Sequence, residues 1–366
     1  MIDDQPVLPQ WERGTVADIV PAILEPEDDR SILPDEVVDA HSVVLLVLDG
    51  LGWEQLQDRA RIAPTLASMQ GQAITTVAPS TTAAALTSIV TGSAPGVHGV
   101  VGYRIDVEGE VLNMLSWRTP RGDARDRIVP EEFQTVPAFL GQRPVVVQNA
   151  PFARTGFTRA HLSETRQRGW RTLPTLPVEV RRAVSSGEPF VYAYYDGIDK
   201  IAHEFGFGEH YDAELAACDR LVADLMMALP RGTAIVVTAD HGLVDCAGAE
   251  RELDPALWPL IDRTSGEGRF RWLHAQPGRS RELLEAATAA HHEQAWVRSV
   301  DQILDENWFG PTVTDVARRR LGDVAIVARD NWTFMDRVEG AGKSLIGRHG
   351  SLTRAEMLVP LVTFCS

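Results

Sequence analysis

Carboxylate and imidazole side chains occur in this sequence at spacings that could bind divalent cations. Asp199 and His203 are four residues apart, so on a helix they share one face and could hold the same ion. Asp240 and His241 directly follow an apolar run, and a strand end that turns into a loop can direct both side chains to one ion. Each pair also has a simpler explanation, a surface ion pair for the first and a turn followed by a helix cap for the second. The pairs therefore indicate a metal site only in combination with further ligands.

Two further candidate ligands, Asp49 and His349, lie in comparable positions. Asp49 follows the apolar run at residues 43–48, and His349 lies in a loop that contains Gly347 and Gly350, before the last apolar run. In open α/β sheets, ligands bind beyond the carboxyl ends of the strands, so polar residues at these ends are expected to converge. A lone loop histidine is usually a surface residue, and only the other candidates make His349 a possible ligand.

Three hydroxyl side chains, Ser80, Thr81 and Thr82, precede a predicted helix of small residues at 83–91, which Gly92 ends. One of these hydroxyls is expected to cap the helix. A hydroxyl at a helix N-terminus also lies beside free N–H groups and the positive end of the helix dipole, where a phosphate group is stabilised. The segment is therefore a candidate phosphate-binding site.

Apolar runs alternate with helical segments along the chain, and these elements must position the candidate residues. The run at 43–48 is continuous, as in a strand buried on both faces of a parallel sheet. A helical segment at 212–229 has an apolar stripe. This alternation predicts an α/β fold with a mostly parallel central sheet between helices. The other predicted strands lie at 145–147, 190–195, 234–237, 324–327 and 358–362.

The predicted organisation is one large catalytic domain with an extension and an insertion. Residues 1–40 are rich in Pro, Asp and Glu and are interpreted as an N-terminal extension, and residues 41–366 as the α/β domain. The alternation of strands and helices breaks after residue 245, where Trp, Arg and Gly are frequent, and we predict a small insertion at about 245–320 over one sheet edge. Its tryptophans are expected to serve packing, and His291 and His292 to lie on the exposed face of a helix.

Composition excludes several classes of protein. The chain has 35 basic and 51 acidic residues, a net charge of −16, which disfavours nucleic-acid polymers and anionic membranes as partners. The three cysteines form no Cys-x-x-Cys pair, so any metal must use oxygen and imidazole ligands. The amino terminus lacks the pattern of a secretory signal, and a cytoplasmic location is expected. Small anionic substrates fit this composition, because bound cations can reverse the local potential.

Read together, the segments resemble the type I phosphodiesterase/nucleotide pyrophosphatase family of the alkaline phosphatase superfamily. The order of the matching fragments is more specific than any one of them. They are the first metal strand at 44–50, the nucleophile segment at 79–82 with 88–92, the Asp-x-x-x-His motif at 199–203, the Asp-His-Gly motif at 240–242 and the terminal His-Gly at 349–350.

The resemblance implies an alkaline phosphatase-like fold and a two-metal site. Thr82 falls on the position of the family's nucleophile, with Thr81 as the alternative, and would form a phospho-threonine intermediate that water hydrolyses. Two divalent cations are implied, zinc in the first place and manganese or iron as alternatives. One cation would be held by Asp49, Asp240 and His241 and would also bind the Thr82 hydroxyl oxygen, and the other would be held by Asp199, His203 and His349.

The sequence also departs from the family pattern. Nucleotide-hydrolysing members have Phe-Pro-Asn-His after the threonine, whereas residues 83–86 are Ala-Ala-Ala-Leu, and Tyr103 stands where those members place a phosphate-binding Asn. Tyr103 is therefore the expected substrate-binding residue. The substrate is expected to be a small phosphorylated molecule, hydrolysed by a phosphodiesterase/nucleotide pyrophosphatase. A phosphomonoesterase, a phosphonate-ester hydrolase, a metal-dependent phosphomutase and, more remotely, a non-catalytic binding protein stay open, as does the oligomeric state.

Overall fold

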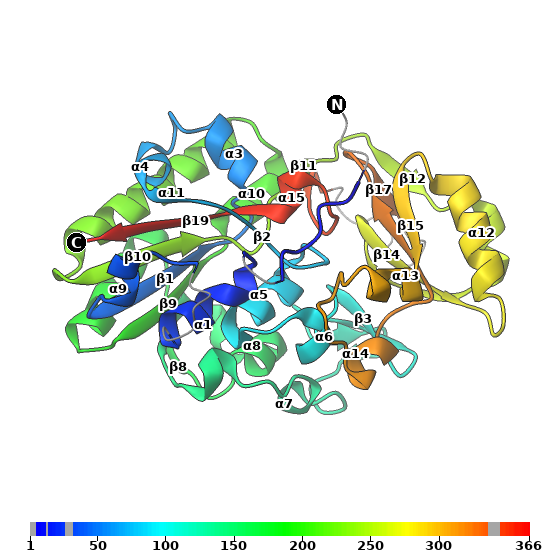
Figure 1. The fold of residues 1–366 in the computed structure, drawn as a ribbon, viewed down its shortest axis with the longest axis horizontal. Coiled ribbons are helices and arrows are strands. Elements are labelled where there is room, and N and C mark those ends of the chain that lie inside the picture. The colour runs from blue at the N-terminus through cyan, green and yellow to red at the C-terminus, as the bar shows by residue number, and fades with distance from the viewer. Residues whose placement is uncertain (1–4, 12–13, 26–31, 336–344) are drawn as a thin grey trace.

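A seven-stranded sheet forms the centre of the computed structural model, which describes residues 5–11, 14–25, 32–335 and 345–366 (Figure 1). Strand β19 is antiparallel to both of its neighbours, and the other six strands run in one direction. This arrangement confirms the predicted fold with a mostly parallel sheet. The strand order is β2 (Gln70–Thr75), β19 (Leu358–Cys365), β10 (Thr233–Thr238), β1 (Ser42–Leu48), β9 (Phe190–Tyr195), β7 (Val145–Asn149) and β8 (Arg166–Trp170).

Strand β1 lies in the middle of this sheet between β10 and β9. Its register pairs Val47 with Thr238 and Leu48 with Tyr195, so the three strands end at the same level. Every residue of β9 and β10 is buried, as the continuous apolar runs predict. The polar residues that follow these strands therefore emerge together at one edge of the sheet.

Helices cover both faces of the sheet (Figure 1). On one face lie α3 (Trp53–Asp58), α4 (Pro64–Ser68), α9 (Leu176–Ser185), α10 (Gly197–Phe205) and α11 (Glu209–Ala228), and on the other α1 (Ile19–Leu24), α5 (Thr82–Thr91) and α8 (Gly156–His161). The predicted helices at 83–91 and 212–229 correspond to α5 and α11. Gly92 ends α5 at a φ of 64°, a backbone conformation that glycine adopts without strain.

Residues at the beginning of the chain pack into the main core. The 3-10 helix η1 (Val16–Asp18) and α1 contact α5, and Val16, Ile19 and Val20 are fully buried. This part of the region interpreted as an extension thus contributes apolar contacts to the central domain. Residues 1–4, 12–13 and 26–31 of that region lie outside the described residues.

A second lobe, residues 250–335, is built around a four-stranded antiparallel sheet at the right of Figure 1. The strand order is β13 (Ile261–Glu267), β14 (Phe270–Ala275), β16 (Val324–Ala328) and β15 (Ala295–Ser299), and α12 (Ser280–His291) packs on it. The prediction that the run at 324–327 belongs to the central sheet is wrong, because β16 pairs antiparallel with β14 and β15. An apolar run shows that a strand is buried but not which sheet contains it.

Buried aromatic side chains fill the space beneath this second sheet. Trp272, Trp296 and Trp308 are buried, so packing is confirmed as their role. His291 is also buried, and its Nε2 accepts a hydrogen bond from the Asp254 N–H at 3.2 Å, so its predicted exposure is wrong. His292 is exposed as expected.

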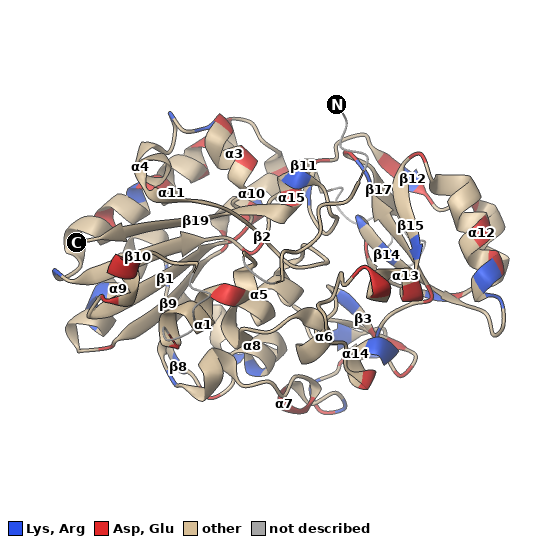
Figure 2. Cartoon of the chain, in the orientation of Figure 1, with Lys and Arg blue, Asp and Glu red and all other residues tan. Residues whose placement is uncertain are grey.

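The central domain and the second lobe also contain shorter elements. Acidic and basic residues are interspersed over both parts (Figure 2). Among the described residues, no helix combines the length and apolar character that crossing a membrane would require. These shorter elements are α2 (Asp35–Val38), α6 (Pro95–His98), β3 (Arg104–Val107), β4 (Glu110–Asn113), β5 (Arg118–Thr119), β6 (Gly122–Asp123), α7 (Pro130–Phe133), β11 (Val244–Asp245), β12 (Glu250–Glu252), α13 (Val300–Asp305), α14 (Asp315–Arg319), β17 (Thr333–Met335), β18 (Gly347–Arg348) and α15 (Arg354–Met357).

Candidate active site

Three of the predicted ligands gather where β1 and β10 end. We call Asp49, Asp240 and His241 the strand-end group, and their ligand atoms all lie within 4.8 Å of one another. His241 Nε2 is 3.5 Å from Asp49 Oδ1 and 3.4 Å from Asp240 Oδ2. The Gly50 N–H donates a hydrogen bond of 3.1 Å to Asp240 Oδ1 and so fixes that carboxylate. The parallel register of β1 and β10 brings these side chains together.

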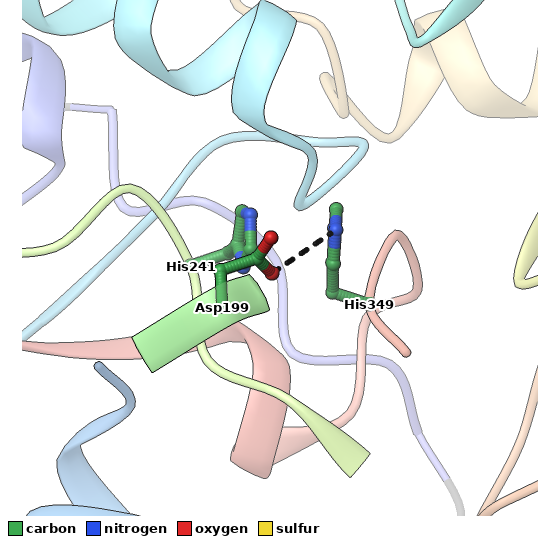
Figure 3. Close-up of side chains that lie close together, drawn as sticks. All are labelled: Asp199, His241 and His349. Atoms are coloured by element: carbon green, nitrogen blue, oxygen red, sulfur yellow. Dashed lines mark ion pairs between the residues drawn. The ribbon is translucent and has the colours of Figure 1, made fainter. Parts of the chain in front are cut away.

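The other three predicted ligands come from a helix and a loop. We call Asp199, His203 and His349 the helix-loop group. The first two lie one turn apart on α10, with His203 Nε2 at 3.2 Å from Asp199 Oδ1. His349 approaches from the loop after β18 and places its Nε2 at 3.8 Å from the same oxygen (Figure 3). The four-residue spacing in the sequence therefore does place two ligand types on one helical face.

The two groups form one continuous cluster. The rings of His241 and His349 are stacked, with centroids 3.6 Å apart and planes inclined by 12°. The Asp199 N–H also donates a hydrogen bond of 3.1 Å to the Asp49 carbonyl oxygen. Figure 3 shows Asp199 beside His241 and facing His349. The structure thus brings together all six side chains that the sequence singled out as ligands.

Backbone carbonyl groups orient the three imidazole rings. The Nδ1 atoms of His203, His241 and His349 donate hydrogen bonds to the carbonyl oxygens of Gly347, Gly242 and Ser80, at 2.6, 3.1 and 2.9 Å respectively. Each Nε2 therefore faces the carboxylates, and in a neutral ring held in this way Nε2 is the nitrogen that can bind a cation. Metal-binding histidines are commonly held in this way, with the second ring nitrogen bonded to a carbonyl or carboxylate.

Buried carboxylate oxygens in the cluster require positive charge. Among the described residues, Asp49 Oδ1, Asp199 Oδ1 and Asp240 Oδ2 are buried and accept no hydrogen bond. Burial and the neighbouring carboxylates Asp240 and Asp199 raise the pKa of Asp49 well above its ordinary value. Such atoms are costly unless a cation neutralises them. The donor set of carboxylate oxygens and imidazole nitrogens fits zinc, manganese or iron.

Protonation of a histidine partly supplies this charge in the helix-loop group. Burial alone would lower the pKa of His203, but the Asp199 carboxylate outweighs it and raises the pKa to about 9. The same ion pair lowers the pKa of Asp199 in spite of its burial. His349 differs, because burial and the adjacent His241 lower its pKa well below the ordinary value.

Thr82 is the hydroxyl that faces the strand-end group. It is the first residue of α5, and its Oγ1 lies 3.1 Å from His241 Nε2. Ser80 serves the loop instead, since its Oγ donates to the Ser351 carbonyl oxygen at 2.6 Å and accepts from the Gly350 N–H at 3.1 Å. Thr81 occupies the N-cap position of α5 but makes no side-chain capping hydrogen bond, so the predicted cap is wrong. The geometry therefore favours Thr82 over the other two hydroxyls.

A cavity of about 230 Å³ opens beside Thr82. Its walls are largely aromatic and aliphatic, and Lys200 supplies a cationic group, paired with Asp196 at 2.5 Å. Tyr194 donates a hydrogen bond from its hydroxyl to Asp49 Oδ2. The lining residues are Asp49, Thr82, Leu86, Leu115, Gln148, Phe152, Thr155, Phe157, Thr158, His161, Leu162, Tyr192, Tyr194, Asp196, Asp199 and Lys200.

Sequence reasoning missed the residues that shape this cavity. Tyr194 lies within a predicted strand, and the alternation of Tyr192 and Tyr194 near the strand end was the available signal. Tyr103 is not part of the cavity wall, and its hydroxyl accepts a hydrogen bond of 2.7 Å from Asn113 Nδ2. Its predicted contact with substrate stays a prediction.

Comparison with known proteins places this geometry in context. A sequence model of the family described as Type I phosphodiesterase / nucleotide pyrophosphatase matches residues 43–352. No curated protein matches the chain. Among solved structures, murine ectonucleotide pyrophosphatase / phosphodiesterase 5 is 16% identical, with a TM-score of 0.65 over 89% of this chain and 88% of that one. An inactive form of that murine protein in complex with AMP matches over 87% of each chain, with 16% identity and a TM-score of 0.65.

A bacterial structure is similar to the same extent. Phosphonoacetate hydrolase from Sinorhizobium meliloti 1021, in complex with phosphonoformate, is 20% identical, with a TM-score of 0.64 over 89% of this chain and 90% of that one. At identities of 16% and 20%, these structures show that the folds are similar and no more.

Proposed function

The chain belongs to the type I phosphodiesterase/nucleotide pyrophosphatase family of phosphoric ester hydrolases, and from this premise we propose that it is a metal-dependent phosphodiesterase that uses Thr82 as nucleophile. The observation that carries the proposal is the position of Thr82 Oγ1 at 3.1 Å from His241 Nε2, at the edge of the six-residue cluster. A nucleophile and the groups that activate it must lie within such a distance.

The strand-end group would hold one divalent cation beside Thr82, and the helix-loop group would hold a second. When bound, these cations would lower the pKa of the Thr82 hydroxyl and offset the negative charge of the phosphoryl group. Three carboxylates and three imidazoles favour zinc, and manganese or iron fit the same donor atoms.

Thr82 Oγ1 would then attack phosphorus while the bond from phosphorus to the leaving oxygen breaks. The product is a phosphorylated Thr82 that keeps the second organic group of a diester on its phosphorus, and the other group leaves as an alcohol or a phosphate. In the second step water cleaves the bond between Thr82 and phosphorus, which releases a phosphate monoester from a diester substrate and regenerates the hydroxyl. The free N–H groups of the first turn of α5 would bind a non-bridging oxygen throughout.

The cavity beside Thr82 would take the organic part of a small phosphorylated substrate. Its apolar walls suit an organic group, and Lys200 offers a positive charge to an anionic one. A phosphonate is the second candidate substrate, because a phosphonoacetate hydrolase shares the fold. Zinc-loaded protein assayed with matched nitrophenyl esters of phosphate, as monoester and diester, and of phosphonate, and with phosphonoacetate itself, would rank these classes.

The nucleophile is tested by Thr82→Ala, with Thr81→Ala as the matched control. The first variant is expected to lose at least about 10³-fold in kcat, as enzymes without their nucleophile do, and to form no covalent phospho-enzyme. Its zinc content should equal that of the parent, because six other side chains hold the ions. Thr81→Ala should keep turnover. A Thr82→Ala protein with parent activity would assign the nucleophile elsewhere.

A further inference from the structure

The second lobe extends a hairpin tip to the loops that carry His241 and His349. The tip comprises Glu267, Gly268 and Arg269, between β13 and β14. Gly350 has a φ of +123°, and a Cβ added there would lie 2.8 Å from Glu267 Cδ. The lobe therefore touches the residue next to His349, and the positive φ of Gly350 favours glycine at this contact.

Arg269 makes the principal contact of this tip with the central domain. Its side chain and that of Glu356 on α15 are both fully buried. Arg269 Nε donates to Glu356 Oε1 at 2.6 Å, and a second guanidinium nitrogen donates to Oε2 at 2.8 Å. This bidentate arrangement fixes the direction of both groups as well as their distance.

Glu356 in turn accepts hydrogen bonds from both of the loops that carry His241 and His349. Its Oε1 accepts a hydrogen bond of 3.0 Å from the Ser351 N–H, two residues after His349. Its carbonyl oxygen accepts one of 2.8 Å from the Gly242 N–H, directly after His241. Glu356 therefore holds the backbone beside both of the stacked rings, those of His241 and His349.

Stability alone does not account for a buried ion pair of this kind. Replacing such a pair by apolar residues of similar volume is often neutral or stabilising, because two charges must lose their hydration. The pair does supply a fixed orientation, and residues that orient metal ligands typically change metal affinity 10–100-fold when they are replaced.

We propose that Arg269 is a positioning residue, supplied by the second lobe, that acts through Glu356 on the loops of His241 and His349. The proposal rests on the proposed function, since the histidines it positions are the proposed metal ligands. It makes the lobe a part of the active site although none of the lobe's residues lines the cavity described above.

Arg269→Met tests this proposal, with Arg320→Met as the matched control. Arg320 is also buried and donates hydrogen bonds to the carbonyl oxygens of Gly99 and Phe133, at 2.7 and 2.9 Å, away from the ligand loops. Zinc titration of metal-free protein should show that the zinc affinity of the site that contains His349 is reduced at least about 10-fold in Arg269→Met. Amide hydrogen exchange at Gly242 and Ser351 should be faster in the metal-free variant, and kcat should fall more than KM rises. Arg320→Met should match the parent in both zinc affinities and in exchange at these amides.

Arg269→Lys decides the question if Arg269→Met fails to fold. It keeps the charge but not the two parallel hydrogen bonds, so its zinc affinity should lie between those of the parent and the methionine variant. Parent zinc affinity and parent exchange in the lysine and methionine variants, or an equal loss in Arg320→Met, would overturn the positioning role. A parent protein that binds no zinc or hydrolyses no ester would instead overturn the proposed function.

Discussion

The strand-end group and the helix-loop group contain the same kinds of ligand but are built on different supports. Asp49, Asp240 and His241 continue from neighbouring strands at the centre of the sheet and are at most 2% exposed. The side chains of Asp199 and His203 are 13% and 22% exposed, and His349 is held by a loop that the second lobe touches. The sheet register therefore places Asp49 and Asp240 of the first group, with Glu356 holding the backbone beside His241, whereas the second group also depends on direct contact between the lobe and the His349 loop.

Single replacements of Asp240 and Asp199 should give the largest effects on zinc binding and turnover, and they test this difference between the two groups. Asp240→Asn should remove the tighter zinc site and lower kcat/KM on the order of 10³-fold, beyond the 10–100-fold typical of residues that only orient ligands. Asp199→Asn should remove the weaker site and leave the tighter one in place. Zinc titration and steady-state kinetics measure both effects. If Asp199→Asn removed the tighter site, the order of the two groups would be reversed.

Stepwise removal of zinc by a chelator tests the order of the zinc affinities of the two groups without a mutation. As a zinc chelator is added, the cation of the helix-loop group should leave first, and turnover should be lost before the second cation is removed. Zinc or manganese should restore activity. The metal content and the rate are measured on the same samples, and a rate that does not respond to the chelator would contradict the metal assignment.

Gly350→Ala would weaken the contact between the lobe and the His349 loop. A methyl group there meets the Glu267 carboxyl carbon at 2.8 Å, and the φ of +123° disfavours any side chain. We expect a loss of about 3 kcal/mol in the free energy of unfolding, measured by urea denaturation, and a weaker second zinc site.

Gly109→Ala is the control for backbone strain. Gly109 also has a positive φ, +88°, but an added Cβ would meet nothing within 4 Å. Gly109→Ala should therefore lower the free energy of unfolding by about 1 kcal/mol and leave the zinc affinity unchanged. Equal losses in the two variants would show that the loop contact is unimportant.

A smaller effect is expected from His161, which lies in the cavity wall rather than in either group. Burial lowers the pKa of His161 to about 4, although its Nδ1 bonds the Phe157 carbonyl oxygen. An unfolded chain binds the proton near pH 6.5, so the unfolded state is favoured as pH falls from about 6.5 towards 4. Between pH 7 and pH 5.5 the free energy of unfolding should fall by about 1 kcal/mol because of this residue.

The measurement is urea denaturation at both pH values, with His161→Gln and His292→Gln compared. The first variant should show a smaller fall than the parent, because its side chain does not titrate. His292 is exposed on the second lobe, and its replacement should leave the fall unchanged. A parent-like fall in His161→Gln would assign the pH dependence to other groups.

Local sequence patterns predicted the parts of this structure that depend on neighbouring residues. Continuous apolar runs gave β1, β9 and β10, and the four-residue spacing of Asp199 and His203 matched one turn of α10. The six ligand types could be found because each follows a strand or lies in a short motif. By contrast, β8 was missed, since none of its first four residues is buried and no apolar run marks it.

Features that depend on pairing between distant segments were not predictable. The sheet to which β16 belongs is decided by hydrogen bonds to β14 and β15, which its own residues do not reveal. Arg269 and Glu356 are 87 residues apart and neither lies in a motif. Their importance follows only from the three-dimensional contact, which is also the reason that the active-site role of the second lobe was not foreseen.

The reversed direction of β19 gives the protein a convenient point of attachment. This strand starts near the catalytic edge of the sheet and ends at Cys365, seven residues later, a span of roughly 24 Å. Cys365 is exposed, whereas Cys218 and Cys246 are buried. A thiol-reactive dye or solid support would therefore couple at the far end of the molecule and leave the substrate cavity open.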